Sequence, residues 1–101
     1  LFLSSGLFEL DALILDDCVR REVSIRSKKS NHVISMKFAD FPYLGIWSKY
    51  TGFDTNYVCI EPWSTLPDAN YLDHALENKV GVRKLAPKSS ETLTFETTIE
   101  E

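Results

Sequence analysis

The stretch EVSIRSKKSNHVISMKF, residues 22–38, decides the predicted fold. Its first part, EVSIR (Glu22–Arg26), alternates apolar with polar side chains, and its last part, HVISMKF (residues 32–38), does the same. Alternation with a period of two is typical of a strand with one buried face. The polar residues 27–31 between the two parts have the composition of a turn. The stretch therefore predicts a β-hairpin.

Further strands are predicted on the C-terminal side of this hairpin, and very little helix. Pro62 is expected to end one of these strands because proline lacks a backbone donor. A polar excursion follows over residues 64–78, with a short helical turn at residues 73–78. The apolar run at residues 7–15 fits a strand or a helix. The predicted further strands cover residues 43–48, 57–61, 79–85 (brief) and 92–99. Short strands at this spacing indicate an all-β fold, an antiparallel sandwich or barrel.

Composition excludes several classes of function. The chain has 101 residues and a net charge of −4, with its basic residues scattered, so no nucleic-acid partner is expected. No apolar span of 18 residues occurs, so no membrane partner is expected either. Cys18 and Cys59 form no CxxC pair, and His32 and His74 lack metal-ligand spacing. We therefore expect no metal or cofactor, and a reducing, cytoplasmic setting.

Two carboxylates are candidates for chemistry. Glu61 lies at a predicted strand end directly before Pro62 and Trp63, where a general base for a polar ligand could lie, although a rim glutamate fits the same pattern. Asp11 interrupts an apolar run, and it is either functional or an exposed capping residue. Trp47 and Trp63 could offer aromatic faces to a sugar ring, while core packing is the commoner use of tryptophan.

Several segments together resemble a known family. They are LFELDALILD (7–16), FPYLGIWSK (41–49), VCIEPW (58–63), LPDAN (66–70) and KVGVRKLAPKSSETLTFETTIEE (79–101). In this order they resemble the aldose 1-epimerase (galactose mutarotase) superfamily, in particular its bacterial lactose-operon-type branch. The resemblance covers nearly the whole chain, and the segment around Glu61 is its most specific part.

The resemblance implies a fold, a reaction and roles. It implies that residues 1–101 are the C-terminal portion of a large antiparallel β-sandwich whose N-terminal portion is absent from this sequence. The implied activity is that of an isomerase interconverting the α and β anomers of an aldohexose such as galactose or glucose. Glu61 matches the general base, Asp11 matches a substrate-binding aspartate, and Trp63 becomes a candidate sugar contact. The catalytic acid is a histidine expected upstream, so the chain alone is expected to be inactive.

Two departures from the family pattern affect the predicted sugar-facing loop. The segment LAPKSSE (85–91) lacks the usual glycine, and Ser64 and Thr65 replace a common aromatic–glycine pair. Two alternatives stay open. One is a hexose-phosphate epimerase of the same fold, for which Arg20, Arg21 and Lys49 are candidate phosphate ligands. The other is a non-catalytic carbohydrate-binding β-sandwich.

Overall fold

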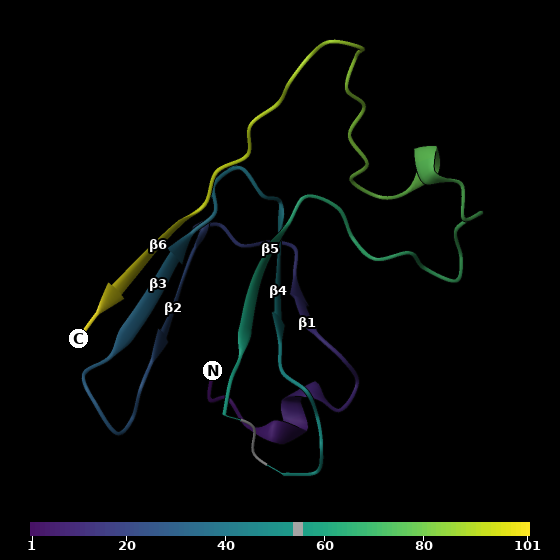
Figure 1. Ribbon diagram of the computed structural model, residues 1–101. Helices are drawn as coiled ribbons and strands as arrows, with labels where there is room; N and C mark the ends of the chain where they lie inside the picture. The colour runs from purple at the N-terminus through teal and green to yellow at the C-terminus, as the bar shows by residue number, and fades with distance from the viewer. Residues whose placement is uncertain (54–55) are drawn as a thin grey trace.

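The fold is all-β in a computed structural model that describes residues 1–53 and 56–101 (Figure 1). Within those residues the chain forms two three-stranded antiparallel sheets, one ordered β1-β4-β5 and the other β2-β3-β6. The strands are β1 (Leu13–Leu15), β2 (Glu22–Arg26), β3 (Val33–Lys37), β4 (Tyr43–Trp47), β5 (Cys59–Trp63) and β6 (Glu96–Glu100). Helical structure in the described residues is limited to the 3₁₀ turns η1 (Ser5–Phe8) and η2 (Leu76–Asn78). The prediction of an all-β fold with little helix is confirmed.

The predicted hairpin is formed by β2 and β3, and β6 pairs with the other side of β3. Strand β6 begins at Glu96, so the predicted strand at residues 92–99 was too long at its start. The backbone N–H of Thr94 instead donates to Asp40 Oδ2 at 2.8 Å, because β3 has already ended at Lys37. The residues just before β6 are therefore bonded to the Asp40 side chain and not to the backbone of a neighbouring strand.

Strand β5 corrects another prediction. Pro62 does not end it: the strand continues to Trp63, and Pro62 pairs with Leu44 of β4. Within this chain β5 is an edge strand of its sheet. Proline is tolerated in edge strands because the side without an N–H can face away from the neighbour.

The core lies where one face of the first sheet meets η1 and the residue that follows β3, Phe38. Phe8, Phe38, Leu44 and Ile46 form a buried cluster, and Phe38 is fully buried. Arg21, just before β2, adds a polar tie across this region because its guanidinium donates to the carbonyl oxygens of Phe41 and Pro42. The core is thus small but fixes β4 against the hairpin.

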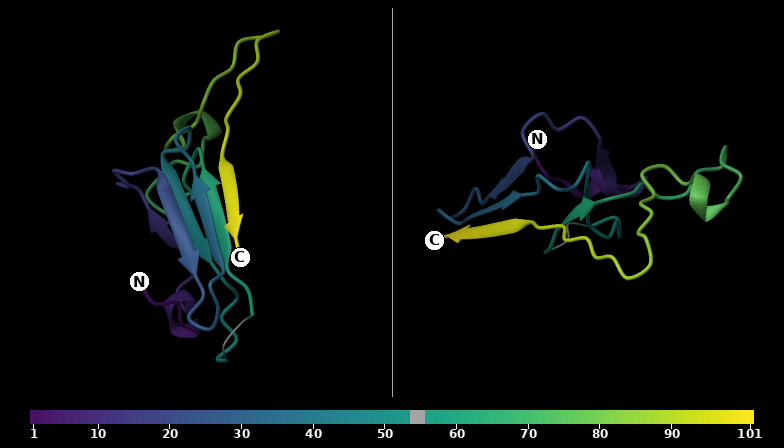
Figure 2. Two further views of the ribbon diagram at one scale, coloured as in Figure 1. Left: turned by 90° about the vertical axis from the view of Figure 1, so that its left-hand side faces the viewer. Right: turned by 90° about the horizontal axis from the view of Figure 1, so that it is seen from above.

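The segment between β5 and β6 forms a long arm that reaches away from both sheets (Figures 1 and 2). It contains η2, close to the predicted helical turn, but the brief strand predicted at residues 79–85 does not form. Instead Gly81, at φ +77°, lies so close to Ser64 that an added Cβ would come 2.9 Å from its carbonyl oxygen. This contact holds the base of the arm against the residues that follow β5.

Candidate functional site

A pocket of about 370 Å³ opens on the face of the first sheet that points away from the core. This volume is within the range of small-molecule sites. The walls come from the η1–β1 connection, all three strands of the sheet and the loop after β5. They include Asp11, Ile14, Trp47, Glu61, Trp63 and Pro67. The three residues predicted to form the site, Asp11, Glu61 and Trp63, therefore line one pocket.

Strand register explains why these side chains meet. Successive residues of a strand point to opposite faces, and residues paired across an antiparallel ladder share a face. Gly45 of β4 pairs with Ile14 of β1 on one side and with Glu61 of β5 on the other. The pocket face is therefore formed by Ile14, Gly45 and Glu61. It also includes Trp47 and Trp63, which lie two residues further along β4 and β5. The residues between them form the opposite face and pack on the core: Leu13, Leu44, Ile46 and Ile60.

Glu61 is half-buried, and its carboxylate is held by its neighbour on the same strand face. The indole N–H of Trp63 donates to Glu61 Oε2 at 3.1 Å. Glu61 Oε1 has no hydrogen-bonding partner among the residues that the structure describes. One oxygen is thus used for orientation, and the other is available to a ligand in the pocket.

Asp11 is held by its own backbone. It lies directly after the η1 turn with φ +91°, and its N–H donates to the carbonyl of Phe8 at 3.2 Å. Its Oδ1 accepts from the N–H of Ala12 at 2.8 Å. Aspartate is among the few non-glycine residues that tolerate positive φ, because its short polar side chain can bond locally. Asp11 is exposed, so it is a polar group at the pocket rim and not a buried charge.

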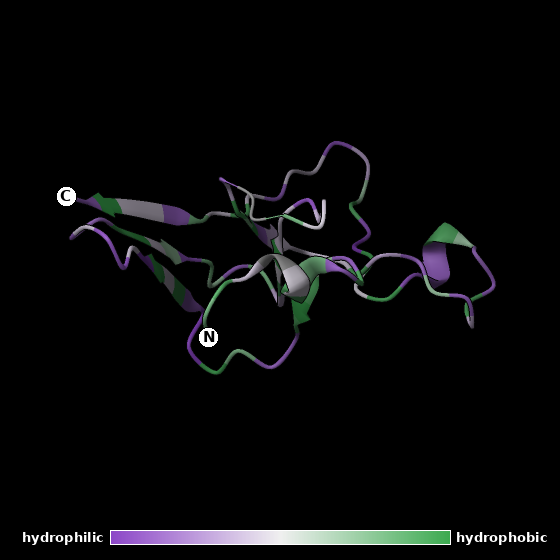
Figure 3. Ribbon diagram, turned by 90° about the horizontal axis from the view of Figure 1, so that it is seen from below, coloured by the Kyte–Doolittle hydropathy of each residue, from purple (hydrophilic) through white to green (hydrophobic). Residues whose placement is uncertain are grey.

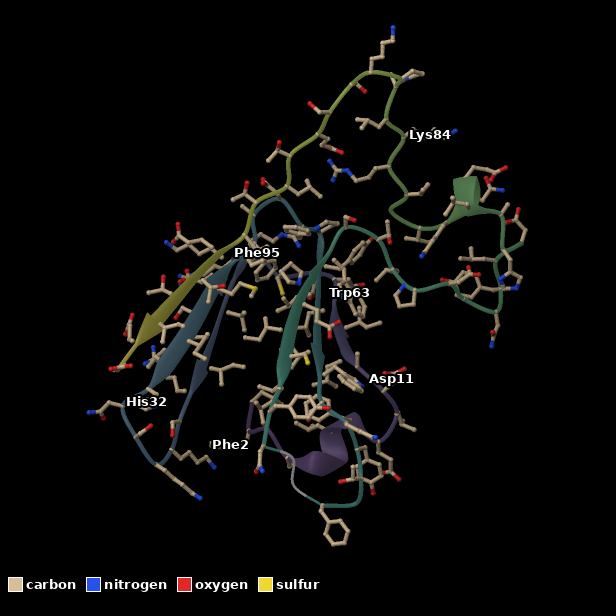
Figure 4. All side chains as sticks on the ribbon, viewed as in Figure 1. Phe2, Asp11, His32, Trp63, Lys84 and Phe95 are labelled. Carbon is tan, nitrogen blue, oxygen red and sulfur yellow. The ribbon has the colours of Figure 1, made fainter. Side chains whose placement is uncertain are left out.

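The histidines and most basic residues considered above lie elsewhere. His32 is at the tip of the β2–β3 hairpin, far from Asp11 and Trp63 (Figure 4). His74 lies in the arm, where its Nδ1 bonds Asp68 Oδ2 at 2.6 Å. Arg21 is engaged with backbone carbonyls on the core side. No group of three metal-ligating side chains occurs in residues 1–53 and 56–101.

Five pocket residues were not assigned to the site from the sequence: Leu10, Ala12, Ile14, Trp47 and Pro67. For Trp47 the sequence allows either core packing or a sugar contact. In the structure Trp47 lies on the pocket face, with its ring centroid 6.3 Å from that of Tyr57. Ile14 and Pro67 also line the pocket. Had residues 13–15 been recognised as a strand, the alternate facing of its side chains would have placed Ile14 on the opposite face from Leu13 and Leu15. Pro67 becomes a wall only because the chain turns back after β5, which no local pattern reveals.

The chain is similar in sequence to LacX. Two LacX proteins of Lactococcus lactis subsp. lactis, one chromosomal and one plasmid-encoded, are each 35% identical to it over 97 residues. The match covers 96% of this chain but 32% of either relative, so the chain spans about a third of their length. No family model and no solved structure matches the chain significantly. Among the described residues, no helix is both long and apolar enough to cross a membrane.

Proposed function

We propose that this chain is part of a carbohydrate-metabolism enzyme of the aldose 1-epimerase type, which interconverts the α and β anomers of an aldohexose. The observation that carries the proposal is the convergence of Asp11, Glu61 and Trp63 on one pocket. The family resemblance assigns roles to Glu61 and Asp11, and Trp63 is the candidate sugar contact. The sequence similarity to LacX supports a role in carbohydrate metabolism.

In the proposed reaction Glu61 acts as general base. Its Oε1 takes the proton from the anomeric hydroxyl as the bond between C1 and the ring oxygen breaks, and an acid protonates that ring oxygen. Rotation about the C1–C2 bond followed by ring closure, with both protons returned, gives either anomer. Among the described residues that line the pocket, none is a histidine. The acid is therefore proposed to come from another part of the protein.

The remaining pocket residues suit sugar binding. The exposed carboxylate of Asp11 can accept hydrogen bonds from sugar hydroxyls. Trp47 and Trp63 provide aromatic surface for the apolar C–H faces of a pyranose ring. Among the described residues that line the pocket there is no lysine or arginine, so the phosphate group of a hexose-phosphate substrate would need basic residues from another part of the protein.

We also propose that the two sheets are completed by further strands of a larger β-sandwich. Each sheet has three strands within residues 1–53 and 56–101, and strands β1, β5, β2 and β6 are edges in that part of the chain. Uncovered edges promote association with other chains, so proteins normally cover them. A chain that spans about a third of its relatives' length leaves residues for that purpose. The pocket would then be closed by side chains from both portions.

The test is Glu61→Gln in the intact protein, assayed by polarimetry on freshly dissolved galactose or glucose. Glutamine keeps an oxygen that accepts from the Trp63 indole but cannot take the proton. We expect the mutarotation rate to fall by about 10²–10⁴-fold with unchanged folding. Glu22→Gln, an exposed glutamate on β2 outside the pocket, is the matched control.

A near-normal rate for Glu61→Gln would refute the base assignment. Sugar binding without mutarotation in the unmutated protein would instead favour the non-catalytic carbohydrate-binding alternative.

A further inference from the structure

The indole ring of Trp63 packs directly against Gly45. A Cβ added at Gly45 would lie 2.6 Å from Trp63 Cζ2 and 2.8 Å from Cε2. Carbon atoms without a bond between them approach only to about 3.5–4.0 Å at their optimum. The indole therefore occupies the space that any side chain at position 45 would need. The three atoms nearest such a Cβ, Cζ2, Cε2 and Cη2, all belong to the six-membered ring of the indole.

The same indole bonds the carboxylate of Glu61. Its Nε1–H donates to Glu61 Oε2, and Gly45 is paired directly with Glu61 across the ladder. The ring thus leans from its own position on β5 over the glycine of β4, with its donor edge toward Glu61. We infer that Gly45 and Trp63 are positioning residues for Glu61: the missing side chain lets the indole lie against the sheet, and the indole N–H fixes one carboxylate oxygen so that the other faces the pocket.

This inference rests on the proposed function, because it gives Glu61 the role of base. A glutamate side chain has several rotatable bonds, and a base acts efficiently only when its oxygen is within hydrogen-bonding distance of the proton it removes. Fixing one oxygen with a charge-assisted hydrogen bond reduces the number of unproductive orientations. Glu61 has no second partner for this purpose among the described residues.

Trp63→Phe and Gly45→Ala separate positioning from simple packing. Phenylalanine keeps an aromatic ring over Gly45 but removes the N–H donor. Alanine at position 45 keeps the donor but displaces the ring. Gly6→Ala is the matched control, because an added Cβ at Gly6 meets no atom within 4 Å.

The first measurement is kinetic, on the intact protein. We expect Trp63→Phe and Gly45→Ala each to lower kcat for mutarotation about tenfold, with KM within about twofold of the original value. Gly6→Ala should change neither. A rise in KM with unchanged kcat for Trp63→Phe would overturn the inference, since it would make Trp63 a sugar contact only.

The second measurement is spectroscopic and does not depend on catalysis. In ¹H–¹⁵N spectra, the Trp63 indole N–H signal, assigned from its loss in Trp63→Phe, should shift in both Glu61→Ala and Gly45→Ala. It should stay in place in Gly6→Ala. An unmoved signal in Glu61→Ala would overturn the inference even if mutarotation is observed. Shifted signals in a protein without mutarotation would refute the proposed function and retain the positioning of Glu61 by Trp63.

Discussion

At the scale of single residues, the two carboxylates of the pocket are oriented in different ways. Glu61 depends on a neighbouring side chain, the Trp63 indole. Asp11 depends on its own backbone, through its positive φ and the bond from the Ala12 N–H to its side chain. A substitution at Asp11 therefore changes the backbone as well as the charge, unless the new residue tolerates the same conformation.

Asn is the substitution that isolates the charge of Asp11. Asparagine accepts positive φ about as readily as aspartate, and its amide oxygen can still accept from Ala12. We expect Asp11→Asn to raise KM for the sugar about tenfold and to change the free energy of unfolding by less than about 0.5 kcal/mol. Steady-state mutarotation kinetics and urea denaturation measure the two quantities. Unchanged KM and kcat would contradict a sugar contact at Asp11.

Sequence pattern made the two carboxylates of the pocket candidates, but only the family resemblance assigned roles to them. Pattern alone could not separate Glu61 from an ordinary rim glutamate, because partial burial and the Trp63 bond appear only in three dimensions. It also gave no reason to single out Gly45, whose importance comes from an indole eighteen positions along the chain on the adjacent strand.

At the scale of elements, prediction was accurate where the signals were local. The β2–β3 hairpin follows from alternation and a polar turn, and it forms as predicted. Prediction was wrong for the end of β5, for the start of β6 and for the conformation of residues 79–85, because each depends on a residue distant in the sequence. Pro62 is accommodated at a sheet edge, Thr94 bonds Asp40, and Gly81 packs on Ser64.

The turn between Asp68 and His74, next to the pocket wall at Pro67, gives an element-scale prediction. The hydrogen bond from His74 lowers the pKa of Asp68 below its ordinary value of 3.8. A carboxylate whose pKa is lower in the folded state stabilises that state above its ordinary pKa, and the contribution is lost as the pH falls through the lowered value. We expect the hydrogen bond between His74 and Asp68 to be present at neutral pH and to be lost in acid, as Asp68 is protonated. Carboxyl ¹³C NMR on Asp68 measures the titration.

His74→Ala supplies the control for that titration. Removing the imidazole should raise the Asp68 midpoint toward 3.8, while the neighbouring Asp73 should keep its own lowered pKa, which comes mainly from the N–H of Ala75. An Asp68 midpoint that does not move in His74→Ala would show that the bond does not form in solution.

At the scale of the whole molecule, the chain is less compact than an independent domain. Its radius of gyration is 16.1 Å, against about 13 Å for a compact domain of 100 residues. Part of the excess comes from the arm between β5 and β6 (Figure 2). In the hydropathy colouring of Figure 3, β6 is hydrophilic at its start and has a hydrophobic band near its tip, at the outer end of the second sheet. There Ile25, Ile34 and Ile99 form a cross-strand row, and Ile99 is 70% exposed.

This row should bind a hydrophobic dye when the 101-residue chain is produced alone. The double substitution Ile34→Thr with Ile99→Thr keeps β-branched residues suited to a strand but removes apolar surface, so dye fluorescence should fall. Val19→Thr, an exposed valine in the connection between β1 and β2, should change it little. Equal fluorescence from all three proteins would contradict an uncovered apolar row. In the intact protein, the proposed additional strands should suppress the signal.

The pairing of β6 with β3 also has a consequence for biosynthesis. Strand β3 is made directly after β2 and can pair with it as soon as both have emerged, but its second partner is β6, which follows the whole of the first sheet and the arm. On the ribosome the outer edge of β3 therefore stays without its partner while β4, β5 and the arm are translated. Unpaired strand edges in nascent chains are prone to aggregation. The β2–β3 pairing and the β3–β6 pairing therefore become possible at two separate times during translation, and chaperones would be of most use in the interval between them.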